Sequence, residues 1–214
     1  EAVAAEAGIS RREIDELTIC RTEQYGEALA AERAFQREWM VPVELPGRKG
    51  STTVIDADEG VHPSTLEGLA ALRPAVPDGV VTFGTQTHPA DGTAGFLVAP
   101  RERAAEIAGG AGVATIVATG TARVAKARMP QAPVPAAQAA LDAAGLRIED
   151  IHIIKTHNPF AVNDVFFARQ TGVDAVAMNP FGCSLVYGHP QAPTGARAIV
   201  ELLHALRRRG GGLG

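Results

Sequence analysis

Cysteine is scarce in this sequence: its 214 residues contain two, Cys20 and Cys183, far apart and in no CxxC pair. A disulfide framework or a zinc knuckle needs more cysteines at closer spacing, so neither is expected, and no metal site is expected. Long apolar runs are also missing, because none approaches the roughly 20 residues that a membrane-spanning helix requires. These absences indicate a globular protein without a membrane as partner.

An excess of positive charge is absent too. Twenty Lys and Arg residues face 24 Asp and Glu residues, for a formal net charge of -4, and the one basic cluster is Arg207, Arg208 and Arg209. This balance argues against nucleic acid as a partner. The first residues mix acidic and basic side chains without the basic and apolar regions of a secretion signal, so we expect a cytoplasmic location.

The composition is otherwise ordinary for a folded domain, with 46% hydrophobic and 21% charged residues in a length that can bury a full core. The sequence opens with Glu1 inside a helical pattern and stops at GGGLG, a glycine-rich turn. We interpret it as an interior piece of a longer polypeptide.

Apolar periodicity and capping residues predict an alternation of helices and strands. Gly8 and Ser10 bound the first two helices, Ser64 caps a third, and Ile199, Leu202, Leu203 and Leu206 share the apolar face of the last. This alternation predicts a layered α/β domain. Helices are expected in residues 1–8, 11–39, 64–73, 133–145, 158–172 and 194–210, and strands in 40–45, 80–84, 112–125 and 149–157.

Two histidines stand in loops that follow predicted strands and precede helices. Gly188, Pro190 and Pro193 fix the backbone around His189, and His157 ends an apolar strand just before Asn158. Such loops are where open α/β sheets bind ligands, and a rigid loop can hold an imidazole against a substrate. The alternatives are that His189 caps a helix or satisfies a buried polar group, and that His157 caps the next helix.

Four motifs, in order along the chain, resemble those of the thiolase family. They are IDADEGVHPSTLEGLAALRPA (55–75), TFGTQTHPADGTAGFLVA (82–99), HNPFAVND (157–164) and GHPQAPTGAR (188–197), and the resemblance covers essentially the whole sequence. It implies a thiolase-like layered α/β fold that is partial. Residues 1–76 would be the end of the N-terminal half with its loop domain, 77–111 the returning strand and helix of that half, and 112–214 the C-terminal half without its last strands.

The resemblance also implies a function. Thiolases carry out Claisen condensation or thiolysis of 3-ketoacyl-CoA, so the full-length protein would be an acyl-CoA acyltransferase, with acetyl-CoA acetyltransferase the leading label. Acyl-CoA and acetyl-CoA would be substrates, with no permanently bound cofactor, and the protein would form a homodimer or homotetramer. The rival reading is a non-catalytic thiolase-like subunit that binds acyl-CoA or a partner. An α/β hydrolase is a third option, but no GxSxG elbow occurs.

Residue roles follow from the same motifs. His189 matches the histidine that activates the family's reactive cysteine, and His157 matches the residue that supports the thioester oxyanion directly or through a water. Because loops that follow strands of the same sheet converge on one crevice, we predict that the two rings lie close together. Thr87 stands at the serine that contacts the pantetheine arm. Leu72 and Phe160 match apolar positions that line the cofactor or acyl pocket, with plain core packing as the alternative.

The departures from the family matter equally. Both reactive cysteines of the family would fall outside this sequence, so the fragment alone should be inactive and unstable. Cys183 replaces a glycine and is expected to fill a packing position, and Cys20 is expected in the core. His88 and Thr85 replace a glycine and an asparagine, which calls the shape of their loop into question. Phosphate contact or ordinary solvation is open for three basic residues, Lys155, Arg73 and Arg197.

Overall fold

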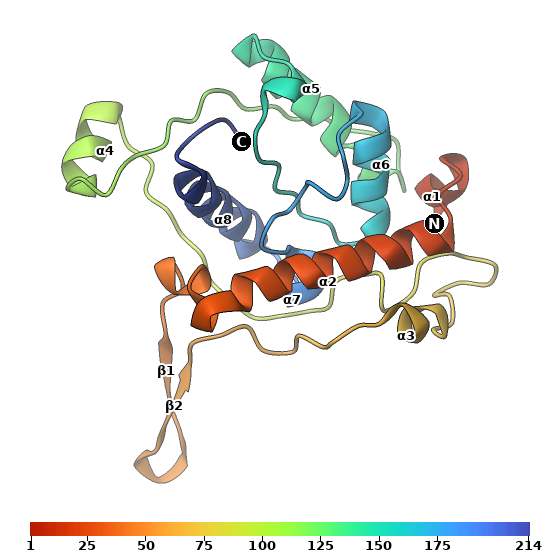
Figure 1. Ribbon diagram of the computed structural model, residues 1–214, viewed down its shortest axis with the longest axis horizontal. Helices are drawn as coiled ribbons and strands as arrows, with labels where there is room; N and C mark the ends of the chain where they lie inside the picture. Colours follow the sequence, from red (N-terminus) through yellow and green to blue (C-terminus); the bar gives the residue numbers. More distant parts are fainter.

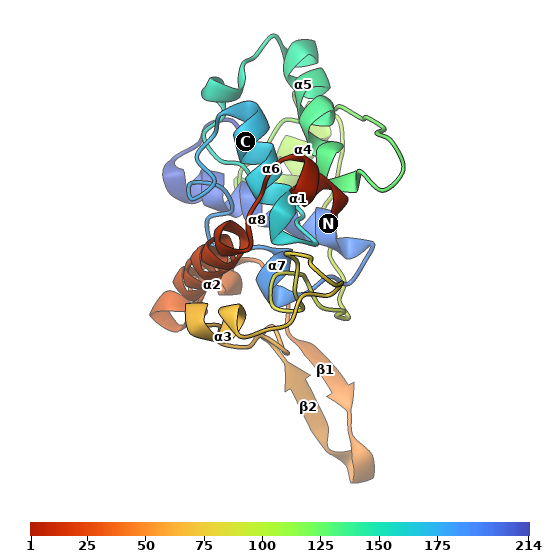
Figure 2. The ribbon, with the colours of Figure 1, turned by 90° about the vertical axis from the view of Figure 1, so that its right-hand side faces the viewer.

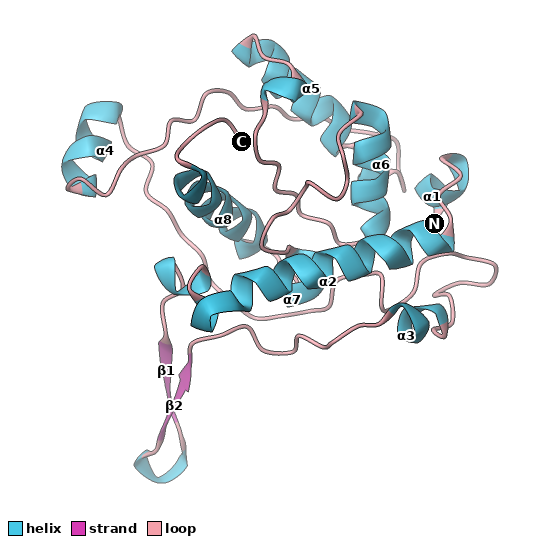
Figure 3. Cartoon of the chain, in the orientation of Figure 1, coloured by secondary structure: helices cyan, strands magenta, loops and turns pink.

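A computed structural model describes residues 1–214, apart from the side chain of Lys49. Helices and connecting loops make up most of the chain, and the two strands lie together in one hairpin (Figure 3). The elements in chain order are α1 (Ala2–Glu6), α2 (Arg11–Arg33), η1 (Gln36–Glu38), β1 (Val43–Pro46), η2 (Arg48–Gly50), β2 (Thr52–Ile55), α3 (Leu66–Ala70), α4 (Arg101–Ala108), η3 (Met129–Gln131), α5 (Pro133–Ala144), η4 (Ile148–Asp150), α6 (Ala161–Thr171), α7 (Ser184–Tyr187) and α8 (Pro193–Arg209).

The long helix α2 crosses the molecule next to α6 and α7 (Figure 1). It begins as predicted, because Ser10 accepts a hydrogen bond from the backbone N–H of Glu13 while the Glu13 carboxylate accepts one from the backbone of Ser10. It ends earlier than predicted, at a kink where Ala31 and Glu32 have positive φ. The buried residues of α2 pack against α6, α7 and α8, so this helix is the support on which the second half of the chain packs.

The β-hairpin extends away from the helical body (Figure 2). Its antiparallel strands pair Val43 with Ile55 and Pro46 with Thr52. The strand expected at 40–45 is therefore confirmed in shifted form, and the stretch expected as an exposed excursion supplies its partner strand. Most hairpin residues are exposed, so this arm contributes little to the core.

The prediction of strands at 80–84, 112–125 and 149–157 was wrong. Residues 112–125 and 151–157 form no ladder in the part of the chain that the structure describes, and Glu149 and Asp150 belong to η4. Residues 80–84 take part only in an isolated bridge between Pro74 and Thr82. Val113, Ile116 and Val117 expose about half or more of their surface. An apolar alternating run predicts a pleated surface, but a strand also needs a neighbour to accept its backbone hydrogen bonds.

The main core joins α1, α2, α6 and α7. Its buried members are Val3, Ala4, Ile9, Ile14, Leu17, Val81, Ala161, Val162, Val165, Cys183 and Leu185. This packing holds the start of α6 against α7, and the loops that precede α6 and follow α7 carry the two histidines.

Helices α5, α6 and α8 are confirmed, and each is followed by a left-handed glycine, Gly145, Gly172 or Gly210. Two details differ. Thr65 rather than Ser64 caps α3, since the Thr65 hydroxyl accepts the Gly68 N–H. Helix α6 begins at Ala161, three residues later than expected.

The apolar face of α8 is not its most buried face. The apolar residues Ile199, Leu202, Leu203 and Leu206 are half-buried or exposed, whereas Thr194, Glu201 and Ala205 are buried. Glu201 can be buried because Lys155 and Tyr187, which lie outside α8, contact its carboxylate. The apolar periodicity of α8 could not reveal these partners.

Candidate functional site

Three loops meet at the N-terminal ends of α6 and α8. The backbone N–H of His189 donates to the carbonyl of His88 at 2.8 Å, and that of Thr87 donates to the carbonyl of Pro159 at 2.8 Å. The backbone of the 85–89 segment is therefore bonded to both histidine loops. Because each bond is between backbone groups, the loops hold one another independently of side-chain motion.

The two histidine rings stack within the structure. The centroids of the His157 and His189 rings lie 4.2 Å apart with an interplanar angle of 29°. The predicted proximity of the rings is confirmed. The capping alternatives fail, because Phe160 and Ala192 occupy the N-cap positions of α6 and α8 and neither histidine bonds to a helix backbone there.

The His189 ring is oriented by Thr194, a buried residue in the first turn of α8. The distance from His189 Nδ1 to Thr194 Oγ1 is 2.7 Å, which leaves Nε2 as the nitrogen available to another group. Gly188 sets the backbone just before the ring, with φ of 93°, and a Cβ at this position would lie 2.8 Å from the Cβ of Ala90. A glycine is thus required here for both conformation and space.

The His157 ring is held by Ser184, the first residue of α7. His157 Nδ1 lies 2.8 Å from Ser184 Oγ, so its Nε2 is again the free nitrogen. Burial and, to a lesser extent, the nearby charge of His189 lower the pKa of His157 to about 4, although the carboxylate of Asp164 acts in the opposite direction. His157 is therefore neutral at physiological pH.

Behind His157 lies a buried polar cluster, here called the site network: Arg21, Thr156, Asn158, Asp164 and Asn179, with Ser184 as its link to the ring. Arg21 of α2 and Asp164 of α6 form a salt bridge of 2.9 Å in which neither side chain is exposed by more than 1%. Asn158 and Asn179 donate to the same carboxylate at 2.8 and 3.0 Å, and Thr156 donates to its other oxygen. The carboxylate is fully satisfied, which makes this burial of charge tolerable.

The three residues expected to bind the thioester have different surroundings in the structure. The Thr87 hydroxyl donates to the carbonyl of Ser184, which places Thr87 at the site, and Phe160 is half-buried against the main core and bridges Gln86. Leu72 follows α3, lies beside Gly84 and is 40% exposed, so it is not a core residue. His88 and Thr85 do not adopt positive φ, and the loop accepts both replacements without that strain.

Neither cysteine of this chain is suited to be a nucleophile. Cys183 is fully buried in the main core, as predicted, and burial raises the pKa of its thiol to about 11. Cys20 is half-buried on α2 rather than in the core, and desolvation raises the pKa of its thiol as well.

The three basic residues considered for phosphate contact differ in their environments. Lys155 and Arg197 are neither solvated nor free, because both are buried in ion pairs with Glu201. Arg73 is exposed, which agrees with the alternative that it is an ordinary solvated side chain.

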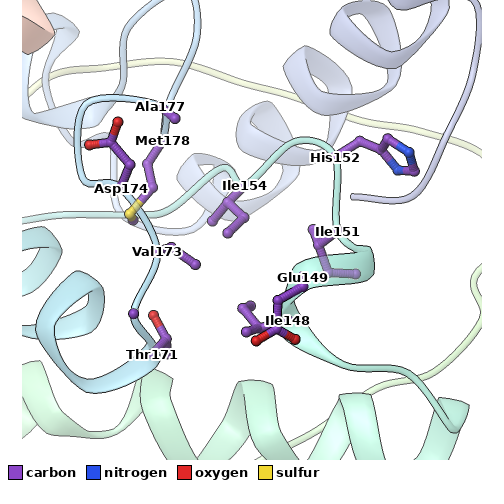
Figure 4. Close-up of a pocket in the computed structure, with 11 residues that line it drawn as sticks. Ile148, Glu149, Ile151, His152, Ile154, Thr171, Val173, Asp174, Ala177 and Met178 are labelled. Carbon is purple, nitrogen blue, oxygen red and sulfur yellow. The ribbon is translucent and has the colours of Figure 1, made fainter.

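A separate pocket of about 250 Å³ lies between residues 148–154 and residues 171–178 (Figure 4). Its walls are mainly apolar, with Ile148, Ile154 and Met178 among them and His152 at one side. It shares no residue with the two histidine loops, so it belongs to a different part of the molecule.

Sequence reasoning missed three site residues: Asn158 and Thr194, which lie within the motifs, and Ser184, which lies four residues before the last motif. Each is a short polar side chain within a few residues of a predicted histidine or of Cys183. The usable signal was a hydroxyl or amide group inside an otherwise apolar, glycine-bounded loop, since such a group needs a partner when it is buried.

Among the described residues, no group of three or more His, Cys, Asp or Glu side chains is placed to hold a metal ion. In the same residues, no helix combines the length and apolar character needed to cross a membrane.

Comparison with known families gives the class of this fold. The thiolase N-terminal domain family matches residues 1–102, and the thiolase C-terminal domain family matches residues 111–214. The chain belongs to the thiolase family and has a thiolase-like α/β fold. The boundaries that we expect at residues 76 and 111 stay predictions.

Particular relatives support this assignment. The chain is 39% identical to an acetyl-CoA acetyltransferase of Escherichia coli, over 100% of this chain and 54% of the relative, and 37% identical to mouse peroxisomal 3-ketoacyl-CoA thiolase A, over 98% and 50%. The crystal structure of an acetyl-CoA acetyltransferase of Bacillus anthracis matches with a TM-score of 0.86 at 28% identity, over 98% of this chain and 53% of that one. The chain spans about half the length of these relatives.

Proposed function

We propose that the protein containing this chain is an acyl-CoA acyltransferase of the thiolase type. It would catalyse Claisen condensation or thiolysis of 3-ketoacyl-CoA, with acetyl-CoA acetyltransferase as the leading activity. The observation that carries this proposal is the stacked pair of His157 and His189, each held through Nδ1 and each with Nε2 free. Names of relatives such as acetyl-CoA acetyltransferase support the same reaction class.

His189 is the general base in this proposal. It removes the proton from a cysteine thiol supplied from outside these 214 residues, and the thiolate attacks the carbonyl carbon of an acyl thioester. A carbon–sulfur bond forms and the carbonyl oxygen becomes an oxyanion. When that intermediate collapses, the bond to coenzyme A breaks and its sulfur takes the proton back from His189.

His157 has the complementary role of supporting the oxyanion, directly or through a water. A general base works best when its pKa is near the working pH, and the pKa of His157, at about 4, is too low. Two imidazolium rings 4.2 Å apart would also repel each other. A neutral His157 beside a His189 that accepts the proton avoids this repulsion.

Thr87, Phe160 and Leu72 are the proposed contacts of the thioester's pantetheine arm and acyl group. The one hydroxyl hydrogen of Thr87 is donated to Ser184, so its oxygen is left to accept from an amide N–H of the pantetheine. The coenzyme A thioester is substrate in this proposal, and no permanently bound cofactor is needed. A homodimer or homotetramer and a cytoplasmic location complete the proposal.

The test is His189→Asn in the intact protein that carries this chain. Loss of the base should lower kcat by about 10²- to 10⁴-fold in an acetoacetyl-CoA thiolysis assay, with the melting temperature unchanged. The matched control is His204→Asn, a change of a histidine on α8 that pairs with Glu38, and this variant should keep the wild-type kcat.

Retention of most activity by His189→Asn would remove His189 from the mechanism. An intact wild-type protein that binds acetyl-CoA but never turns it over would favour the rival, non-catalytic reading.

A further inference from the structure

Ser184 stands between the site network and the His157 ring. Its side chain is buried, and its Oγ lies 2.8 Å from His157 Nδ1 and 3.4 Å from Asn158 Oδ1. A hydroxyl has a single hydrogen to donate. The proton position on His157 therefore depends on which of these two neighbours receives that hydrogen.

The orientation of Asn158 is fixed from the other side. Asp164 is ionised beside Arg21, so its oxygens only accept hydrogen bonds, and the group that Asn158 turns toward it at 2.8 Å must be the amide NH₂. The amide oxygen of Asn158 therefore faces Ser184. Asn158 is completely buried, and Ser184 Oγ is the hydroxyl donor within hydrogen-bond distance of this oxygen among the described residues.

The direction of the Ser184 hydrogen bond, and with it the proton position on His157, follows from counting donors and acceptors. If Ser184 donates to Asn158, its oxygen accepts from His157, and the His157 proton is on Nδ1. If Ser184 instead donates to His157, the proton is on Nε2 and the buried oxygen of Asn158 has no donor. The first arrangement satisfies every buried group along the line from Arg21 to His157.

We infer that Ser184 is a positioning residue, which holds neutral His157 with its proton on Nδ1 and leaves Nε2 as a hydrogen-bond acceptor. This inference rests on the proposed function for its consequence. A ring that accepts at Nε2 cannot donate to the thioester oxygen itself. His157 would instead accept one hydrogen of a water whose other hydrogen supports the oxyanion.

The experiment reads the proton position directly. The intact protein is labelled with ¹⁵N in its histidine rings, and long-range ¹H–¹⁵N correlations at pH 7 distinguish a protonated ring nitrogen from a bare one. His157→Asn identifies the signals of His157. We expect the wild-type ring to carry its proton on Nδ1, and Ser184→Ala to move the proton to Nε2.

Two further variants separate positioning from general damage. Ser184→Thr keeps the hydroxyl and should keep the proton on Nδ1, while Ser51→Ala at the tip of the hairpin is the control for removing a serine elsewhere. Turnover should fall about 10-fold in Ser184→Ala with KM little changed, and should recover in Ser184→Thr.

A wild-type His157 protonated on Nε2, or a Ser184→Ala ring that stays protonated on Nδ1, would overturn the inference. The wild-type spectrum decides by itself if Ser184→Ala does not fold. Failure of the proposed function would register separately, as activity that survives His189→Asn, because the ring spectra do not depend on turnover.

Discussion

Two buried charge clusters organise this chain, and they differ in how they end. The site network has one acid and one base, Arg21 and Asp164, and its hydrogen bonds run outward to the His157 ring. The second cluster, called here the α8 network, has two acids and two bases, and its hydrogen bonds lead to the side chains of Tyr25 and Tyr187 rather than to the histidines. Its members are Lys155, Glu201, Arg197 and Asp58.

Both clusters join segments that are far apart in the sequence. Arg21 and Asp164 are 143 residues apart, and Asp58 and Arg197 are 139 residues apart. In the α8 network the Arg197 guanidinium also stacks 3.4 Å from the centroid of the Tyr187 ring. The α8 network therefore fastens the chain after β2 to α8, whereas the site network both fastens α2 to α6 and leaves an open nitrogen at its end. A buried ion pair contributes to chemistry only where its hydrogen bonds end on a group that remains available.

The largest expected effect comes from breaking the site network at its centre. Asp164→Ala leaves the Arg21 guanidinium buried without its acid and removes the acceptor of Asn158 and Asn179. We expect the free energy of unfolding of the intact protein to fall by about 3–5 kcal/mol in urea titrations.

Asp142→Ala on the exposed side of α5 is the matched control and should change little. A loss below about 1 kcal/mol in Asp164→Ala would mean that water replaces the carboxylate, and that the network is not the support of the site.

The α8 network should tolerate the loss of one acid better. Asp58→Asn keeps one acceptor oxygen, and Arg197 retains its bond to Glu201 at 2.9 Å, so the expected loss is about 2 kcal/mol. The same variant should leave the proton of His157 on Nδ1 in the ring spectra, because no hydrogen bond joins Asp58 to the site network among the described residues.

Asp56→Asn, a neighbouring acid that is half exposed and pairs with Arg33, is the control and should cost less. A shift of the His157 signals in Asp58→Asn would show that the two clusters are coupled and would remove the distinction between them.

The sequence predicted the part of the site that depends on chain order. Histidines at the ends of two apolar segments before two helices were expected to converge, and they stack. The start of α2 was equally readable, since Ser10 and Glu13 form a local capping box. These features involve neighbours in sequence or the general geometry of loops at one edge of a fold, which a pattern of residue types can express.

What could not be predicted depends on partners that are distant in sequence. Glu201 is buried because Lys155 and Arg197 neutralise it, and nothing in the periodicity of α8 marks it as internal. The segment 112–125 has the apolar content of strands but no neighbour to pair with in the described chain. Ser184 gained its role from the orientation of Asn158, which in turn depends on an arginine more than a hundred residues earlier.

The smallest expected effect is a pH dependence that only the site network should show. An unfolded histidine titrates near pH 6.5, while the folded His157 has a pKa of about 4 because of burial and the charge of His189. Between these values the unfolded chain binds more protons, so stability is lost as the pH falls from about 6.5 toward 4 and is unaffected by this group above 6.5. The ring is partly exposed, so the slope should stay well below the limit of about 1.4 kcal/mol per pH unit that one proton allows.

His157→Asn removes the titrating ring and should flatten this part of the pH profile of urea unfolding, and Asp58→Asn should keep the wild-type slope. The wild-type ring signals should titrate with a midpoint near pH 4. A midpoint near 6.5, or equal slopes in wild type and His157→Asn, would show that the folded protein leaves the basicity of His157 unchanged. The ring would then be able to compete with His189 for the proton, and the division of labour between the two histidines would have to come from their position relative to the substrate alone.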